Sequence, residues 1–288
     1  MVEKIGVIGG SGLYELDGLE VLEQREVETP FGKPSDKLVM ARLEGKEVVF
    51  IPRHGVGHRV SPSEVPYRAN IYAMKSVGVT KLVSVSAVGS MKPEIAPGHV
   101  VFVDQFIDRT VGRDRTFFEN GVVAHVSFGD PVCKELQAEL IAAAEGLDLT
   151  THVGGAYVCI EGPQFSTKAE SETFRSWGVS VIGMTNLPEA RLAREAEMSY
   201  ATVALVTDYD CWHEGHDQVS VETVIETLRN NVANAKTLLR KVILAHDPAK
   251  ARTSPAKDAL RNAVMTAPDA IPAEARQRLA LFLDKYMS

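Results

Sequence analysis

The chain has 288 residues, of which 45% are hydrophobic, and it carries a formal net charge of −7. This length and hydrophobic share allow a sizeable core, in one large domain or two. The acidic balance without a basic block argues against a nucleic-acid partner, and no apolar run is long enough to span a bilayer. No signal peptide precedes the first apolar run, and the three cysteines show no paired spacing, which suits a reducing cytoplasm.

Apolar runs typical of strands alternate with amphipathic patterns typical of helices. Short β-branched runs predict strands at residues 5–8, 48–51, 80–86, 99–103, 156–160, 180–184 and 200–206. Helical spacing of apolar residues predicts helices at residues 64–77, 131–146, 168–176, 188–196 and 220–245. The alternation predicts a single α/β domain with a central mixed β-sheet flanked by helices on both faces.

The end of the chain departs from this alternation. After a first domain at residues 1–246, residues 247–258 are polar with two prolines and predict a linker. Residues 259–288 follow as a helical extension, in which apolar residues between 279 and 283 have amphipathic spacing within a helix expected over 272–286.

The first predicted strand runs into a glycine-rich turn at residues 9–12, with one hydroxyl at Ser11. Such a turn exposes backbone N–H groups that can bind a phosphate oxygen. The turn matches neither the dinucleotide fingerprint nor the nucleophile elbow, because Leu13 stands where the elbow has its last glycine. A plain tight turn is the alternative.

Arg53 and His54 directly follow the second predicted strand, and Gly55 and Gly57 permit close approach of a ligand. The guanidinium fork of arginine suits a phosphate dianion, and histidine adds a donor. A solvated surface pair is the alternative here.

The third predicted strand ends in small residues. Ser86, Ala87 and Gly89 could let a ligand lie against the main chain, or they could serve close packing of the strand on a helix.

Two carboxylates, Asp208 and Asp210, follow the last predicted strand. On extended backbone their side chains point the same way. Repulsion and partial burial then raise one pKa, which leaves a protonated donor beside an ionised acceptor. The edge of adenine matches this pair, because N7 accepts a hydrogen bond and the 6-amino group donates one, whereas a 6-oxopurine presents an acceptor there. Capping of a turn or of the next helix is the alternative.

A metal site is not expected. Cys211, His213 and His216 could resemble metal ligands, but no second ligand cluster completes a tetrahedral set.

Together, these segments resemble the trimeric purine nucleoside phosphorylases over residues 4 to 245. The resemblance rests on residues 8–12, 29–36, 53–55, 104–110, 161–165, 184–185, 188–189 and 207–212. It implies the fold of that family and phosphorolysis of S-methyl-5'-thioadenosine to adenine and 5-methylthioribose-1-phosphate, a step in purine and methionine salvage. Inorganic phosphate would be the co-substrate, with no cofactor and no metal.

The resemblance also implies which residues form the site. The expected phosphate ligands are Ser11, Arg53, His54, Ser86, Thr185 and the backbone of Ala87. The expected nucleoside contacts are Phe165 on the purine face, Met184 beneath the ribose, Asp208 and Asp210 at the base, and Val219, Val221 and Val224 around the 5'-methylthio group. Asp208 would deliver a proton to N7.

His125 matches a histidine that the family supplies from the neighbouring subunit toward the 5' end of the nucleoside. A homotrimer is therefore expected, and a hexamer is possible in the family.

Alternative activities stay open. Gly183 stands where close relatives in the family carry asparagine, and related methylthioinosine phosphorylases carry glycine there but lack the Asp-Tyr-Asp segment. A 6-oxopurine nucleoside or methylthioinosine phosphorylase is the second reading. A nucleoside hydrolase and a non-catalytic nucleoside-binding module are alternatives from other functional classes. Neither needs a phosphate site, so the presence of Ser11, Arg53, His54 and Thr185 together argues against both.

Overall fold

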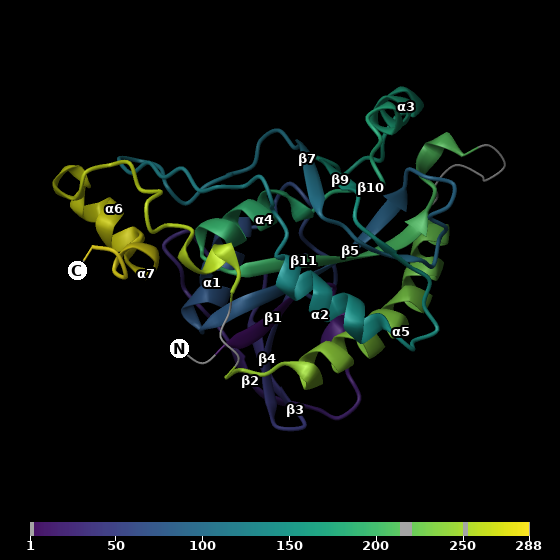
Figure 1. Cartoon of the computed structure of the whole chain (residues 1–288), viewed down its shortest axis with the longest axis horizontal. Coiled ribbons are helices and arrows are strands. Elements are labelled where there is room, and N and C mark those ends of the chain that lie inside the picture. Colours follow the sequence, from purple (N-terminus) through teal and green to yellow (C-terminus); the bar gives the residue numbers. More distant parts are fainter. Residues whose placement is uncertain (1–2, 214–220, 250–252, 288) are drawn as a thin grey trace.

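The computed structural model describes residues 3–213, 221–249 and 253–287 (Figure 1). The strands are β1 (Lys4–Gly9), β2 (Leu19–Arg25), β3 (Leu38–Leu43), β4 (Lys46–Pro52), β5 (Val79–Ser90), β6 (Val100–Phe102), β7 (Gln105–Arg109), β8 (Thr151–Val153), β9 (Ala156–Ile160), β10 (Val181–Gly183) and β11 (Ser199–Asp208). The α-helices are α1 (Tyr67–Ser76), α2 (Lys134–Ala144), α3 (Lys168–Ser176), α4 (Asn186–Glu195), α5 (Val221–Ala245), α6 (Ala273–Arg278) and α7 (Ala280–Leu283).

All of these strands belong to one mixed sheet, with β5 as its hub. The main path runs β2-β3-β4-β1-β5-β10-β9-β7, and β11 leaves it by pairing with β5 and β6. Strands β4, β1, β5 and β11 are parallel neighbours in that order. Their carboxyl ends therefore lie along the same edge of the sheet.

Helices cover both faces of the sheet. Consecutive residues of β4 show this, because Phe50 belongs to the core formed with α2 and α5, while Ile51 belongs to the core formed with α1 and α4. Strand β11 is buried along nearly its whole length, as its continuous apolar run predicts. The predicted fold class, a single α/β domain with a mixed sheet between helices, is confirmed.

Several strands escaped the sequence analysis. Strand β2 is exposed at almost every position and pairs antiparallel with β3 at the edge of the sheet. This strand is held by backbone pairing with β3 and is not buried. Its residues therefore show no apolar run that would predict a strand. Strand β3 and the short strands β7 and β8 were not predicted either.

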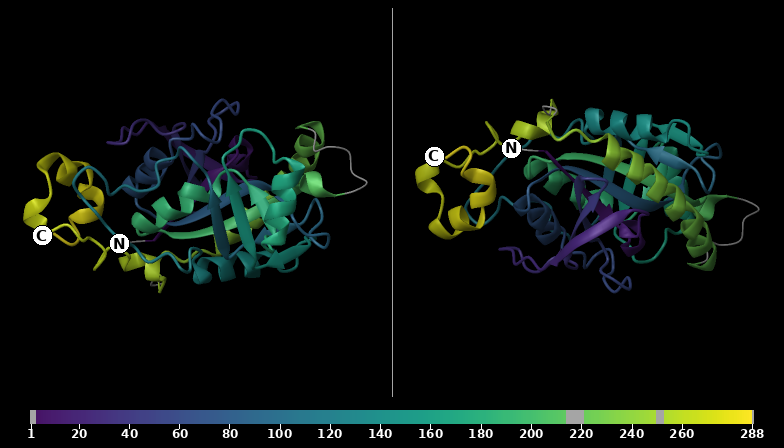
Figure 2. Two further views of the ribbon diagram at one scale, coloured as in Figure 1. Left: turned by 90° about the horizontal axis from the view of Figure 1, so that it is seen from above. Right: turned by 90° about the horizontal axis from the view of Figure 1, so that it is seen from below.

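The end of the chain packs into the main core. The helix predicted over 272–286 is divided at Leu279 into the short helices α6 and α7. Leu279, Phe282 and Leu283 belong to the same apolar cluster as Ile71 of α1. Both views of Figure 2 show this segment at one end of the molecule. The division of the chain at residues 246 and 258 stays a prediction.

Within the described ranges, none of the helices combines the length and apolar character that crossing a membrane requires.

The C-terminal segment should contribute to the stability of the whole domain. Phe282 is 3% exposed, and its ring centroid lies 4.6 Å from that of Phe117. Replacing Phe282 by Ala should lower the free energy of unfolding by about 3–5 kcal/mol, because it removes a buried aromatic ring. Chemical unfolding followed by circular dichroism measures the change.

Leu22→Ala is the matched control, because this side chain on β2 is 44% exposed. Its effect should stay within about 0.5 kcal/mol. Equal stabilities of the two variants would show that the C-terminal segment lies outside the cooperative fold.

Candidate active site

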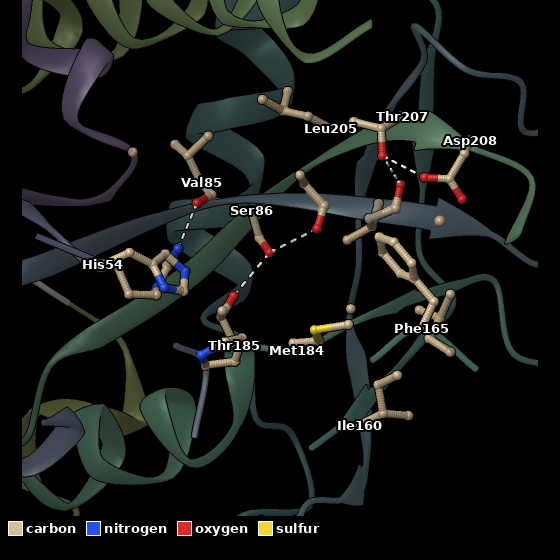
Figure 3. A pocket seen from close by; sticks show the side chains of 18 of the residues that line it. His54, Val85, Ser86, Ile160, Phe165, Met184, Thr185, Leu205, Thr207 and Asp208 are labelled. Atoms are coloured by element: carbon tan, nitrogen blue, oxygen red, sulfur yellow. Dashed lines mark hydrogen bonds between the residues drawn. The ribbon is translucent and has the colours of Figure 1, made fainter. Parts of the chain in front are cut away.

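The segments singled out at strand ends meet in one pocket of about 630 Å³ (Figure 3). The reason is topological, since the carboxyl ends of parallel strands share an edge and ligands of open α/β sheets bind there. Nine of the residues predicted for the site line the pocket: Arg53, His54, Ser86, Ala87, Phe165, Met184, Thr185, Asp208 and Asp210.

One end of the pocket carries hydroxyl groups. The Oγ of Ser86, on β5, lies 3.0 Å from the Oγ1 of Thr185, the residue before α4. Gly10 and Gly12, from the turn after β1, line the same pocket. The hydroxyl of Ser11 lies outside the described side chains. Hydroxyls and backbone N–H groups are donors that suit an anion.

Arg53 is engaged by a carboxylate in the interior. Its Nε and Nη2 donate to the two oxygens of Glu189 at 2.7 and 3.0 Å, and its Nη1 donates to the carbonyl of Val85 at 2.9 Å. Burial lowers the pKa of Arg53, but the charge of Glu189, its hydrogen bonds to Arg53 and the nearby tyrosines together outweigh burial, and the net shift is upward. The sequence predicted that the guanidinium of Arg53 would offer two nitrogens to phosphate. In the structure Nε and Nη2 bind Glu189 instead, and only the Nη1 side of the guanidinium remains for a ligand.

His54 is neutral in the empty pocket. Its Nδ1 donates to the carbonyl of Val60 at 2.8 Å, and its ring stacks on that of His58 with centroids 4.4 Å apart. Burial, aided by the charge of Arg53, lowers the pKa of His54 to about 4. Its Nε2 is then an acceptor at neutral pH, which suits the hydroxyl of hydrogen phosphate and differs from the donor role expected from the sequence.

The two aspartates reach the pocket by a turn. Strand β11 ends at Asp208, and Asp210 has a φ of +55°, so the predicted presentation on extended backbone is wrong. The N–H of Asp210 donates to Oδ1 of Asp208 at 2.8 Å, and the hydroxyl of Thr207 donates to Oδ2 at 2.7 Å. Asp208 thus closes a turn and lines the pocket at once.

Burial raises the pKa of both Asp208 and Asp210, and the charge of Asp208 raises that of Asp210 further. Glycine at position 89 makes room for this pair, because a Cβ there would lie 2.9 Å from Oδ1 of Asp208. Burial therefore makes protonation of these two carboxyls easier than it is in water.

Phe165 and Met184 supply the apolar wall. Phe165 is 46% exposed, so its ring face is available to a ligand. Met184 follows β10, and its sulfur packs against Gly162. A Cβ on residue 162 would lie only 2.5 Å from that sulfur. Figure 3 shows both side chains at the pocket between Thr185 and Asp208.

His125 does not line this pocket. His125 is exposed, and its backbone N–H donates to the carbonyl of Ala263 at 2.8 Å, which places it beside the C-terminal segment. Val219 lies outside the described residues, and so do the side chains of Val221 and Val224. Val232, farther along α5, lines the pocket.

Sequence reasoning missed several lining residues: His58, Ile160, Ser166, Thr207 and Val232. Ile160 and Thr207 lie at strand ends, so the rule that found Arg53 could have found them. Val232 lies inside a long helix, where no local signal marks it. No cluster of three potential metal ligands occurs in the part of the chain that the structure describes.

Comparisons with known proteins agree with this geometry. The profile of the phosphorylase superfamily matches residues 4–244. A protein from Geobacter sulfurreducens named S-methyl-5'-thioadenosine phosphorylase is 58% identical over 288 residues, which cover 100% of both chains. The crystal structure of a methylthioadenosine phosphorylase from an Antarctic soil metagenomic library has a TM-score of 0.91 at 48% identity, covering 98% of this chain and 99% of that one.

The methylthioadenosine phosphorylase of Schistosoma mansoni, solved in complex with adenine, has a TM-score of 0.81 at 33% identity and covers 99% of each chain. These similarities extend along almost the whole chain and confirm the resemblance inferred from the sequence. The chain belongs to the phosphorylase superfamily.

Proposed function

We propose that this protein catalyses the phosphorolysis of S-methyl-5'-thioadenosine to adenine and 5-methylthioribose-1-phosphate. The observation that carries the proposal is a single pocket with the Ser86 and Thr185 hydroxyls at one end and the carboxyls of half-buried Asp208 and buried Asp210 at the other. The names of the similar proteins support the same reaction.

The carboxyl end suits adenine. A protonated Asp208 donates to N7, and Asp210 accepts from the 6-amino group. Burial makes this division of protons favourable, because it raises the pKa of both groups. Phe165 would stack on the purine face, and such stacking stabilises a bound base by about 1–3 kcal/mol.

The hydroxyl end suits phosphate. Ser86, Thr185, the Ala87 N–H, Ser11 and the Nη1 side of Arg53 would donate to its oxygens, while neutral His54 would accept its hydroxyl hydrogen. Bound there, a phosphate oxygen attacks C1' of the ribose from the side opposite the base. The C1'–N9 bond breaks, its electron pair passes into the purine, and the proton from Asp208 makes adenine a neutral leaving group. The protein thus contributes position and charge stabilisation.

The sugar and its 5' substituent would lie between these two ends. Met184 would face the ribose, and Val232 lines the pocket wall. By the family resemblance, Val219, Val221 and Val224 would enclose the methylthio group. Burial of apolar area there stabilises the complex by roughly 25 cal/mol per Å².

His125 lies outside the pocket of its own chain, which supports its delivery to the pocket of a neighbouring subunit. A cyclic homotrimer closes such a head-to-tail contact without an open edge. Three unpaired cysteines support a cytoplasmic location. The chemistry described requires phosphate as co-substrate and neither a cofactor nor a metal.

A substrate panel tests the function. Methylthioadenosine, methylthioinosine, adenosine and inosine are each incubated with the enzyme, with and without phosphate, and the free base is measured by chromatography. We expect methylthioadenosine to be cleaved best, and only with phosphate. Phosphate-independent release would indicate a hydrolase, and preference for the inosine compounds would indicate a 6-oxopurine phosphorylase.

Asp208→Asn should lower turnover of methylthioadenosine by roughly 10²–10⁴-fold, the usual cost of losing a general acid. The fold should survive, because the Asn oxygen still accepts from Asp210 N–H and Thr207 can donate to Val88 instead. Steady-state kinetics measure the loss, and phosphate-induced stabilisation against heat should be unchanged. Near-native turnover would exclude Asp208 as the acid.

Arg53→Ala should raise the KM for phosphate roughly ten- to a hundredfold, because hydrogen bonds to charged groups contribute ~1.5–3 kcal/mol. It should also lower the free energy of unfolding by about 3–5 kcal/mol, because Glu189 is left buried and unpaired. The double variant Arg53→Ala, Glu189→Gln removes that buried charge. It should regain stability and keep the high phosphate KM, so a normal KM would make the role of Arg53 purely structural.

His125→Ala should fold and assemble, yet lose efficiency chiefly toward the nucleoside. Mixed with Asp208→Asn chains under exchange of subunits, it should recover part of the activity, because some interfaces then combine an intact His125 with an intact Asp208. Activity is measured before and after exchange, and analytical ultracentrifugation gives the assembly. A fully active monomer on dilution would exclude shared sites.

A further inference from the structure

Tyr157, on β9, lies directly behind the hydroxyl end of the pocket. It is fully buried, and its ring packs edge-on against Phe106 with centroids 5.8 Å apart. The backbone N–H of Thr185 donates to its hydroxyl at 3.4 Å, and the same hydroxyl lies 3.4 Å from Oγ of Ser86. Burial raises the pKa of Tyr157 well above its ordinary value, so the hydroxyl keeps its proton.

The same hydroxyl explains the glycine at position 183. A Cβ on Gly183 would lie 2.0 Å from the oxygen of Tyr157 and 2.6 Å from its Cζ. Tyr157 pairs with Val181 in the parallel register of β9 and β10, so backbone pairing holds the ring at this place. The tyrosine oxygen therefore occupies the volume that any side chain at position 183 would need.

The direction of the hydrogen bonds gives this contact a consequence for anion binding. Because Tyr157 accepts from the Thr185 N–H, its own proton is available to the side chains beside it, Ser86 Oγ at 3.4 Å and the Thr185 hydroxyl. The Ser86 hydroxyl itself donates to the carbonyl of Ala87 at 3.3 Å. When Tyr157 donates to Ser86, the serine hydrogen stays available to turn from that carbonyl toward a ligand. Without the tyrosine hydroxyl, Ser86 would be free to accept from Thr185, 3.0 Å away, and the pocket would lose a donor.

We propose that Tyr157 is a positioning residue of the phosphate site: its hydroxyl replaces a side chain at position 183 and orients the Ser86 and Thr185 hydroxyls toward the anion. This inference rests on the proposed function, because it assumes that phosphate binds at the hydroxyl end of the pocket.

Tyr157→Phe tests the orientation, because it removes only the hydroxyl. The KM for phosphate should rise roughly three- to tenfold, the effect of one neutral hydrogen bond. The KM for methylthioadenosine should stay within about twofold of the wild-type value. General damage to the pocket would instead raise both KM values. Tyr72→Phe is the control, since Tyr72 packs on Phe282 away from the pocket and should change neither KM.

Phosphate binding is also measured directly, by titration calorimetry on the wild type and both variants without nucleoside. Weaker binding by Tyr157→Phe alone supports the inference even if the wild type shows no phosphorolysis, which would refute only the proposed function. A phosphate affinity equal to that of the wild type, or equal losses for both substrates, would overturn the positioning role.

A double-mutant cycle tests the steric pair. Gly183→Ala alone should lower the unfolding temperature and weaken phosphate binding, because its Cβ meets the tyrosine oxygen. In a Tyr157→Leu background, which lacks that oxygen and Cζ, the same Gly183→Ala change should cost much less. Contacting residues show such non-additivity. Additive costs in both backgrounds would mean that Tyr157 does not determine the residue at position 183.

Discussion

The buried ion pair between Arg53 and Glu189 is the contact on which the site depends. The pair joins Arg53, the residue after β4, to Glu189 on α4. Ser84 of β5 and Tyr200 of β11 donate hydrogen bonds to the same carboxylate. Four elements are thus held at one point by charge-assisted hydrogen bonds. A charge pair in the interior is costly to desolvate, so it adds little net stability, but a partner moved out of place would leave the other unpaired. Such a contact selects one arrangement of the strand ends.

This arrangement explains how an acidic protein can bind an anion. The formal net charge is −7, and the buried arginine at the site is balanced by its carboxylate. The remaining groups are hydroxyls, backbone N–H groups and an imidazole that burial keeps neutral. Under the proposed function, phosphate is therefore recognised by the Nη1 side of Arg53 together with dipoles whose placement and orientation matter, because dipoles act strongly where water is excluded. The hydroxyl of Tyr157, which lies behind the pocket wall, matters for the same reason, because it would orient the Ser86 and Thr185 hydroxyls.

Burial has opposite chemical effects at the two ends of the pocket. It lowers the pKa of His54, which favours the neutral ring, and it raises the pKa of Asp208 and Asp210, which makes their protonation easier. Both shifts have one origin, since a low-dielectric environment disfavours the charged form of any group. Under the proposed function, burial in one cavity thereby suits one group to accept from hydrogen phosphate and another to donate to a purine nitrogen.

The sequence by itself determined the positions of most strands that carry apolar runs, and with them the strand ends where Arg53 and Asp208 lie. That was possible because apolar periodicity and glycine turns are local properties of the chain. It also determined the family, through residue types at many separate positions. Strand β2 escaped because its pairing partner, not its own composition, defines it. Only the tertiary structure decided that the fork of Arg53 faces Glu189, that Asp210 reaches the pocket by a turn, and that Tyr157 fills the space beside Gly183. These contacts join residues far apart in the chain, and their geometry follows from sheet register and burial, which no local pattern encodes.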